Sequence, residues 1–256
     1  MEIKTDIIYG RNPVVEALRL GNIKIEKIYI RFGSKGYQID RIVQIARKNN
    51  VPVSMLEKTN FNRLEQELVR SEDTQGVIAL ISPINYLELE ELVQIAFSRQ
   101  DNPVLVFLDR IQDPQNLGAI ARTSECAGVG GLVMTTKETA PVNATVIKAS
   151  AGGILNIPVA RVSSSSQALE FLKSKGFWIV GTAPTGGRIY TEGIYDQPIV
   201  VAIGSEGKGL SKSVLKHCDY IVEIPVFGKV ESLNASVSAG IILYEILRQR
   251  GSFGSK

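Results

Sequence analysis

Residues 224–239 read IPVFGKVESLNASVSA, a loop of small polar residues that runs straight into a strongly apolar helical segment. Asn234 has the side chain of a helix N-cap, and the first backbone N–H groups of an α-helix have no partners within that helix. Such groups can meet a polar ligand. Because helices commonly begin at Ser or Asn, this join indicates a binding site only if other segments support it.

Two earlier segments share this organisation. Residues 108–123 read LDRIQDPQNLGAIART, in which an apolar run gives way to a polar turn and then to a helical pattern. If that helix begins near Asn116, Arg122 lies on a neighbouring turn. Residues 199–210 read IVVAIGSEGKGL, a strand of the buried type that ends in a glycine-rich turn. Glycines there let the backbone come close to a ligand.

Taken together and in this order, the three segments resemble the signature motifs of the SpoU (TrmH-like) RNA ribose 2′-O-methyltransferases. The motifs are Asn-x-Gly-x-x-x-Arg at 116–122, Gly-x-Glu-x-x-Gly at 204–209, and Ile-Pro at 224–225 followed by Ser-Leu-Asn-x-Ser at 232–236. Residues 8–18, IYGRNPVVEAL, also resemble the start of a small N-terminal domain that many members carry. The resemblance therefore spans the whole chain and is strongest to the enzymes that modify a guanosine of 23S rRNA.

The resemblance implies a role for particular residues. Arg122 corresponds to the catalytic arginine of the family, and the residues implied around the target ribose are Asn116, Glu206, Ser232 and Asn234. The backbones at Gly204, Ile224 and Leu233 are implied to hold S-adenosyl-L-methionine, with Thr182 lining the same pocket. Because an arginine is nearly always protonated, we expect Arg122 to clamp a phosphate or to polarise the ribose hydroxyl, and action as a base is the alternative.

Alternating strand-like and helical stretches predict two α/β units in this chain of 256 residues. In the first, strand-like runs at 25–30, 51–56 and 76–81 alternate with helical spacing at 37–48 and 60–69, after a short helix that Asn12 and Pro13 begin as N-cap and first-turn residue. We expect an RNA substrate-binding domain at 1–82, which the resemblance relates to ribosomal protein L30e. Residues 83–102 are expected to form a linker, with an acidic amphipathic helix at 87–97.

The second unit, 103–256, is predicted to be the methyltransferase domain. Its strand-like runs lie at 104–108, 132–135, 157–160, 178–181, 199–203 and 220–224, and one intervening helix, at 167–175, ends at Gly176. This pattern predicts a mostly parallel sheet with helices on both faces, whose ligands bind beyond the carboxyl ends of the strands. The resemblance implies the SPOUT fold with its deep trefoil knot.

Charge is unevenly distributed along the chain. Residues 1–50 carry ten Lys/Arg against five Asp/Glu, whereas residues 51–102 carry four against nine. Alone, this pattern is typical of an ordinary solvated surface. With the resemblance, six basic residues become candidates for phosphate contacts: Arg11, Arg19, Lys24, Lys27, Arg31 and Lys35. Where the family's N-terminal domain usually has His-Gln-Gly, this chain has Thr74-Gln75-Gly76, so the RNA contact expected there is changed.

Other classes of function fit the residues poorly. His217 is the only histidine, which argues against a multi-histidine metal site, and a hydrolase built on it would lack the Gly-x-Ser-x-Gly elbow. The turn at Gly204 matches neither a P-loop nor Gly-x-Gly-x-x-Gly. Cys126 and Cys218 lack zinc spacing, which predicts reduced thiols in the core of a cytoplasmic protein. No apolar run is long enough to suggest a membrane span.

The helix expected after Asn234 is apolar on more than one side, which predicts a homodimer formed by the C-terminal domain. The residues that carry this prediction are Val237, Ile241, Ile242, Leu243, Tyr244, Ile246 and Leu247. Three alternatives for function stay open. These are methylation of an rRNA adenosine, as in resistance enzymes, or of tRNA; a non-catalytic RNA-binding protein of ribosome assembly; and a nucleotide-dependent oxidoreductase. The N-terminal domain favours rRNA over tRNA.

Overall fold

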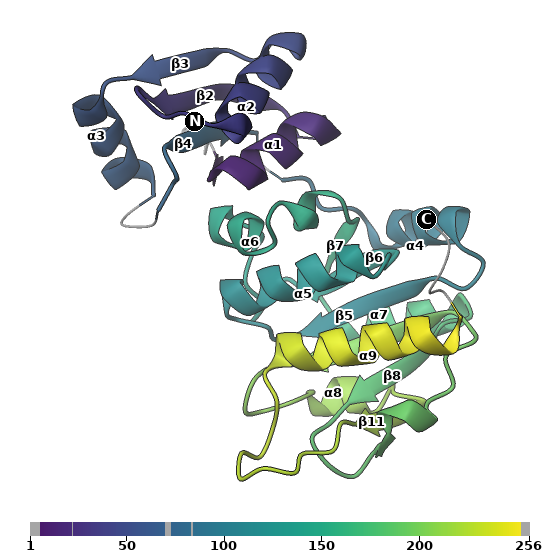
Figure 1. Ribbon diagram of the computed structural model, residues 1–256. Coiled ribbons are helices and arrows are strands. Elements are labelled where there is room, and N and C mark those ends of the chain that lie inside the picture. Colours follow the sequence, from purple (N-terminus) through teal and green to yellow (C-terminus); the bar gives the residue numbers. More distant parts are fainter. Residues whose placement is uncertain (1–5, 22, 70–72, 83, 252–256) are drawn as a thin grey trace. The chain divides into compact units, whose positions relative to one another are not determined.

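A computed structural model describes residues 6–21, 23–69, 73–82 and 84–251. The chain divides into two compact α/β units (Figure 1). Unit 1 comprises residues 1–85 together with 142–156, and unit 2 comprises residues 86–141 and 157–256. No helix among the described residues is both long enough and apolar enough to cross a bilayer.

Unit 1 is built on a four-stranded sheet of order β1-β4-β2-β3. The strands are β1 (Asp6–Tyr9), β2 (Ile25–Arg31), β3 (Val53–Leu56) and β4 (Val77–Ile81), with β4 antiparallel to both neighbours and β2 parallel to β3. Helices α1 (Arg11–Leu20) and α2 (Tyr37–Lys48) pack together, and α3 (Lys58–Leu68) brings Phe61 against Tyr9 and Ile78 of the sheet. The α/β alternation predicted for this unit is therefore present.

The start of unit 1 differs from the sequence prediction in two ways. Strand β1 was not predicted, and Asn12 is not the N-cap of α1. The N-cap is Gly10, whose φ of 91° turns the chain from β1 directly into the helix. Asn12 therefore lies in the first turn, where its Oδ1 accepts a hydrogen bond of 3.0 Å from Gln38 Nε2. Because this φ favours glycine, the N-cap position carries no side chain that could cap the helix.

Unit 2 contains a seven-stranded sheet of order β7-β6-β5-β10-β8-β11-β9. All of its strand pairings are parallel. The strands are β5 (Val104–Asp109), β6 (Gly131–Thr135), β7 (Val159–Val162), β8 (Trp178–Thr182), β9 (Arg188–Ile189), β10 (Ile199–Gly204) and β11 (Tyr220–Glu223). Every residue of β5 and β10 is buried, because helices cover both faces of a parallel sheet. The mostly parallel sheet is confirmed, and the knot stays a prediction.

The helices of unit 2 cover both faces of the sheet (Figure 1). On one face, α5 (Pro114–Cys126) and α9 (Ala235–Gln249) lie side by side. On the other, one apolar cluster joins the sheet to α4 (Leu89–Arg99), α7 (Ser165–Ser174) and α8 (Lys212–Leu215). Short helical segments complete the chain: α6 (Ala144–Ala149), η1 (Gly153–Leu155) and η2 (Tyr190–Glu192). Helices therefore support the strands of this sheet from both faces.

Residues 83–102 do not act as a simple linker. Helix α4 is amphipathic and acidic as predicted, but its apolar stripe of Leu89, Leu92, Val93 and Ala96 is buried in the core of unit 2. It lies so close to β6 that a Cβ at Gly131 would be 2.8 Å from Leu92 Cδ2. Conversely, residues 142–156, which the sequence placed inside the second domain, cluster with unit 1.

If α4 is part of the core of unit 2, Leu92→Ala should lower the free energy of unfolding by about 2–5 kcal/mol, because it removes buried methyl groups and leaves a cavity. Glu91→Ala, on the exposed side of the same helix, should change it by less than about 0.5 kcal/mol. Urea denaturation followed by circular dichroism measures both. Equal, small effects in the two variants would mean that α4 is only a connector.

Candidate functional site

Asn234 is the N-cap of α9, as the sequence predicted. Its Oδ1 accepts hydrogen bonds from the backbone N–H groups of Ser236, at 2.8 Å, and Val237, at 3.4 Å. The side chain therefore satisfies donors that the sequence suggested were open to a ligand. Its amide nitrogen is left to contact other segments.

That nitrogen joins the three sequence motifs. Asn234 Nδ2 donates to Asn116 Oδ1 at 2.9 Å and also to Glu206 Oε1, and Asn116 Nδ2 donates to the same carboxylate oxygen at 2.6 Å. Helix α5 starts at Pro114, with Asp113 as its N-cap, so Asn116 lies in the first turn and does not itself begin the helix. Residues far apart in the sequence thus form one hydrogen-bonded group.

Glu206 lies on a turn that folds tightly back onto the end of β10. Ser205 and Gly209 pair across this turn, in which Gly207 and Gly209 have positive φ. A Cβ at Gly204 would lie 2.2 Å from the carbonyl carbon of Gly209, so only glycine fits at that position. The turn therefore fixes where the Glu206 carboxylate lies.

A hollow opens beside this turn, at the carboxyl ends of β8, β10 and β11. We call it the glycine-turn hollow; its lining includes all four residues that the sequence assigned to the cofactor, together with two assigned to the ribose: Thr182, Gly204, Ile224, Leu233, Glu206 and Ser232. The remaining lining is largely apolar side chains and backbone. This is the edge of the sheet where ligands of parallel α/β folds bind.

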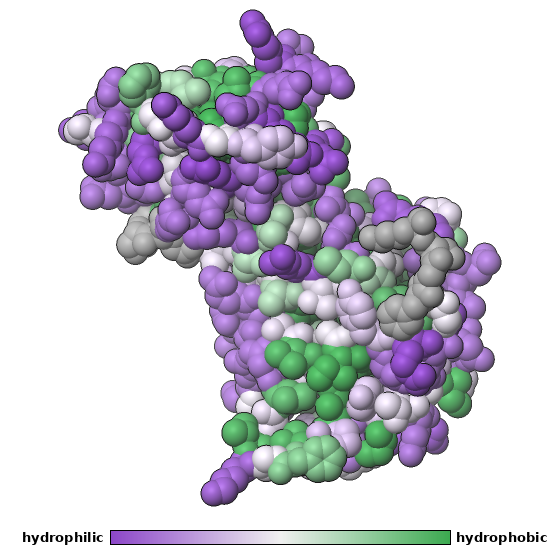
Figure 2. Space-filling model, viewed as in Figure 1, coloured by the Kyte–Doolittle hydropathy of each residue, from purple (hydrophilic) through white to green (hydrophobic). Residues whose placement is uncertain are grey.

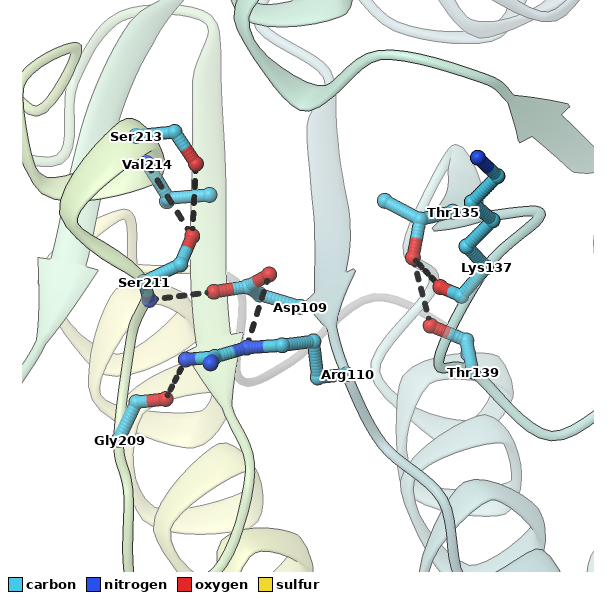
Figure 3. A network of polar contacts seen from close by, with 9 residues as sticks. All are labelled: Asp109, Arg110, Thr135, Lys137, Thr139, Gly209, Ser211, Ser213 and Val214. Atoms are coloured by element: carbon cyan, nitrogen blue, oxygen red, sulfur yellow. Dashed lines mark hydrogen bonds and ion pairs between the residues drawn. The ribbon is translucent and has the colours of Figure 1, made fainter.

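Sequence reasoning missed a second polar group at the same edge (Figure 3). Asp109, the last residue of β5, is buried, and its Oδ2 accepts a hydrogen bond of 2.6 Å from the backbone N–H of Ser211. Arg110 follows with a φ of 62°; its Nε lies 3.6 Å from Asp109 Oδ1, and its Nη2 donates to the carbonyl of Gly209 at 3.1 Å. An Asp-Arg pair directly after a buried strand was the available signal.

Arg110 borders a second hollow, which we call the Arg110 hollow. Its lining includes Arg110, Asp113, Asn116, Glu138, Glu206 and Lys208. Glu206 thus lies between the two hollows and lines both. The arrangement provides an apolar compartment and a charged compartment on either side of one carboxylate.

Arg122 is not brought to this site by its own chain. It is exposed on α5 and lines neither hollow. A step of six residues along an α-helix turns about 120° away from the starting side chain and rises about 9 Å. Arg122 therefore points to a different side of α5 from Asn116, and its assigned role stays a prediction.

The six candidate phosphate-binding residues differ in their exposure and in whether their charged groups already contact other protein groups. Arg11 donates to the carbonyls of Gln75, at 3.2 Å, and Lys35, at 3.3 Å, so its guanidinium is already engaged within unit 1. Arg19 pairs with Glu16 at 3.4 Å. The ammonium of Lys27 lies 4.9 Å from the centre of the Tyr29 ring. Lys24 and Lys35 are exposed, and Arg31 is partly buried.

The Thr74 substitution also has a structural explanation. Thr74 is fully buried; its hydroxyl donates to Glu65 and accepts a hydrogen bond of 3.2 Å from the N–H of Gly76. The neighbouring Gln75, with a φ of 52°, accepts the backbone N–H of Arg11 at 3.0 Å. This tripeptide therefore supports the interior of unit 1.

The cysteines and the histidine lie outside the site. Cys126 is exposed, which corrects the expectation that it is a core residue. Cys218 is partly buried, and this burial raises the pKa of its thiol to about 11, which keeps it protonated at neutral pH. His217 Nε2 lies 3.9 Å from Glu170 Oε1. These residues are structural or peripheral in this fold.

Two family models match the chain. Residues 103–244 match the SpoU rRNA methylase family, and residues 7–87 match a domain described as RNA 2′-O ribose methyltransferase substrate binding. In sequence, the chain is 34% identical over 254 residues to YacO of Bacillus subtilis, which is assigned to the TrmH family of tRNA/rRNA methyltransferases; the alignment covers 99% of this chain and 100% of that protein.

Solved structures similar to this chain include two bound to AdoMet, which is S-adenosyl-L-methionine. The SpoU methyltransferase AviRb from Streptomyces viridochromogenes, in complex with AdoMet, shares 25% identity with a TM-score of 0.79, covering 97% of this chain and 91% of that one. An AdoMet-bound rRNA methyltransferase from Sinorhizobium meliloti shares 26% identity with a TM-score of 0.78, covering 97% and 88%.

Proposed function

The chain belongs to the SpoU rRNA methylase family of RNA methyltransferases, and we propose that it transfers a methyl group from S-adenosyl-L-methionine to the 2′-hydroxyl of a ribose in RNA. One observation carries the proposal: the hydrogen-bonded group of Asn116, Glu206 and Asn234 lies beside a hollow at the carboxyl ends of the strands. The match of residues 7–87 to a substrate-binding domain supports RNA as the partner.

The glycine-turn hollow suits the chemistry of S-adenosyl-L-methionine. Its apolar and backbone lining fits an adenine ring, with Ile224 and Leu233 beside the close-packed backbone at Gly204. The hydroxyl of Thr182 is already engaged, since it donates to the carbonyl of Ala202 at 3.0 Å. Glu206 supplies the negative charge that favours a sulfonium. When bound there, the cofactor supplies an activated methyl group.

The protein residues then have to orient the ribose hydroxyl and receive its proton. Glu206 has one oxygen occupied by two amide donors, and no hydrogen bond to its Oε2 is found among the described residues. That oxygen can accept the proton or bind a ribose hydroxyl. Asn116 and Asn234 fix the carboxylate, and Ser232 lies at the same hollow to contact the sugar.

Arg122 enters this proposal through a second copy of the chain. On α9, Val237 is 49% exposed and Tyr244 is 44% exposed, and Figure 2 shows apolar residues gathered over this helix. Such a face favours association with another apolar surface. We infer a homodimer through the C-terminal unit, in which the Arg122 of one subunit completes the site of the other.

Arg122→Ala should abolish methyl transfer to RNA and leave the affinity for S-adenosyl-L-methionine within about threefold, because the guanidinium is assigned to the RNA hydroxyl or phosphate. Arg122→Lys should be nearly as damaging, since an ammonium cannot reproduce the planar fork. Turnover and calorimetric binding separate the two effects. Arg99→Ala, an exposed arginine at the end of α4, is the control. Near-normal turnover by the lysine variant would contradict the assignment.

Mixing two inactive variants tests whether Arg122 acts across subunits. A heterodimer of Arg122→Ala and Glu206→Ala chains, purified through two different affinity tags, contains one complete site of its two if Arg122 acts on the partner subunit. It should then recover about half of the wild-type activity. If Arg122 serves its own chain, both sites are defective and the heterodimer stays inactive. Failure to isolate any heterodimer would contradict the dimer itself.

We further propose that the RNA is 23S rRNA and that the modified residue is a guanosine. The support is the substrate-binding domain, together with the similarity to rRNA methyltransferases. In unit 1, the exposed Lys24 and Lys35 are the best placed of the basic candidates for phosphate contacts, whereas Arg11 is engaged internally. If the protein bound RNA and never methylated it, the assembly-protein alternative would replace this proposal.

Replacing both Lys24 and Lys35 by alanine should weaken binding to 23S rRNA and flatten its salt dependence. Each lost phosphate contact lowers the slope of log affinity against log salt by about 0.7–0.9. Filter binding at several salt concentrations gives the slope, with Lys58→Ala, exposed on α3, as the control. An unchanged slope in the double variant would mean that these lysines are merely solvated.

A further inference from the structure

We propose that the Arg110 hollow receives the guanine base of the target nucleotide and that Arg110 contacts this base. The inference rests on the proposed function and extends it to a second compartment of the same site. It depends on the placement of Arg110, on the mixture of charges around it, and on the carboxylate that this hollow shares with the glycine-turn hollow.

The position of the hollow fits a base whose ribose lies at Glu206. The Arg110 hollow has a volume of about 320 Å³, which is in the range of small-molecule sites. It shares Ser205, Glu206 and Ala235 with the glycine-turn hollow. A nucleotide whose hydroxyl faces the methyl donor across Glu206 therefore has this space available for its base.

Arg110 is held in place before any ligand arrives. Its Nη2 donates to Gly209, and Asp109 lies beside its Nε, while the side chain remains only 23% exposed. The guanidinium carries five N–H donors, and no hydrogen bond from Nη1 is found among the described residues. An arginine fixed in this way can donate to a ligand without losing much conformational freedom.

The mixture of charges favours a base over a phosphate. Arg110 and Lys208 line the hollow together with the carboxylates of Asp113, Glu138 and Glu206. Three carboxylates would repel a phosphate, whereas guanine presents both hydrogen-bond acceptors and hydrogen-bond donors. Its O6 and N7 accept from an arginine, and its N1–H and N2 amine donate to a carboxylate. Adenine has an amine where guanine has O6, and that amine would face the Arg110 donors.

The backbone around the hollow supports a functional role. Arg110, with a φ of 62°, and Glu138, with a φ of 61°, both adopt the left-handed conformation and both line this hollow. Side chains other than glycine seldom adopt it, and such residues cluster at functional sites. The segment that carries Glu138 is held by Thr135, whose hydroxyl contacts the carbonyl of Lys137 at 2.7 Å and the hydroxyl of Thr139 at 2.8 Å (Figure 3).

The first test identifies the base. The full-length protein is incubated with labelled S-adenosyl-L-methionine and total RNA from cells that lack it, and the RNA is digested to nucleosides for mass spectrometry. We expect 2′-O-methylguanosine. A methylated adenosine, uridine or cytidine would overturn this inference and the guanosine assignment, and would leave ribose methylation of RNA intact. No ribose methylation by the wild-type protein would overturn the proposed function, and this inference with it.

The second test asks whether Arg110 reads the acceptor edge of the base. The mapped RNA segment is synthesised with guanosine or with 7-deazaguanosine, which lacks the N7 acceptor and keeps N1–H and the N2 amine, at the target. The wild-type protein should prefer guanosine by about tenfold to a hundredfold in kcat/KM. Arg110→Ala and Arg110→Gly should lose that preference, which is a ratio between two substrates on the same variant and is not changed by a general loosening of the turn. The glycine variant accepts the positive φ, which guards against misfolding. Lys137→Ala, which is outside the lining, should behave as wild type. Undiminished preference in either Arg110 variant would overturn the assignment.

Discussion

The site depends on the two ends of one amide side chain. The oxygen of Asn234 caps α9, and its nitrogen bonds Asn116 of α5 and Glu206 of the glycine-rich turn. A helix start, a neighbouring helix and a strand-end turn are thereby fixed against one another by a single residue. Because α5 and α9 also lie side by side along their length, the amide bonds orient polar groups on a frame that apolar packing already holds.

A second set of hydrogen bonds, made by Asp109 and Arg110, holds the same turn. Buried Asp109 accepts the N–H of Ser211, and Arg110 reaches the carbonyl of Gly209. The turn is thus held at its far end by β5 and near Glu206 by Asn116 and Asn234. A turn with this much glycine would lose considerable backbone entropy on ordering, and these side-chain bonds offset that loss. They also explain how Glu206 keeps a defined position although it lies on a glycine-rich segment.

The sequence predicted the elements whose signal is local. Buried strands such as β5 and β10 appear as short apolar runs, and the N-cap role of Asn234 follows from its side chain. What failed depended on tertiary context. The acidic face of α4 resembles that of a linker helix, and only the packing against β6 shows that it belongs to the core. Motif spacing correctly placed Asn116 and Arg122 on one helix, but it does not show which of the two faces the site. Arg110 was overlooked because the Asp-Arg pair at the end of β5 does not by itself reveal the left-handed backbone and the contact with Gly209 that position the side chain.

The position of Glu206 between two hollows has a thermodynamic consequence. If occupancy of one hollow shifts this carboxylate or alters its hydrogen bonds, the affinity of the other hollow changes, and linkage requires the effect to be reciprocal and equal in both directions. Methyl donor and RNA would then not bind as independent ligands, although we propose a separate compartment for each. The order in which they bind, and how readily the demethylated product leaves, would be set by the same few hydrogen bonds that position the carboxylate.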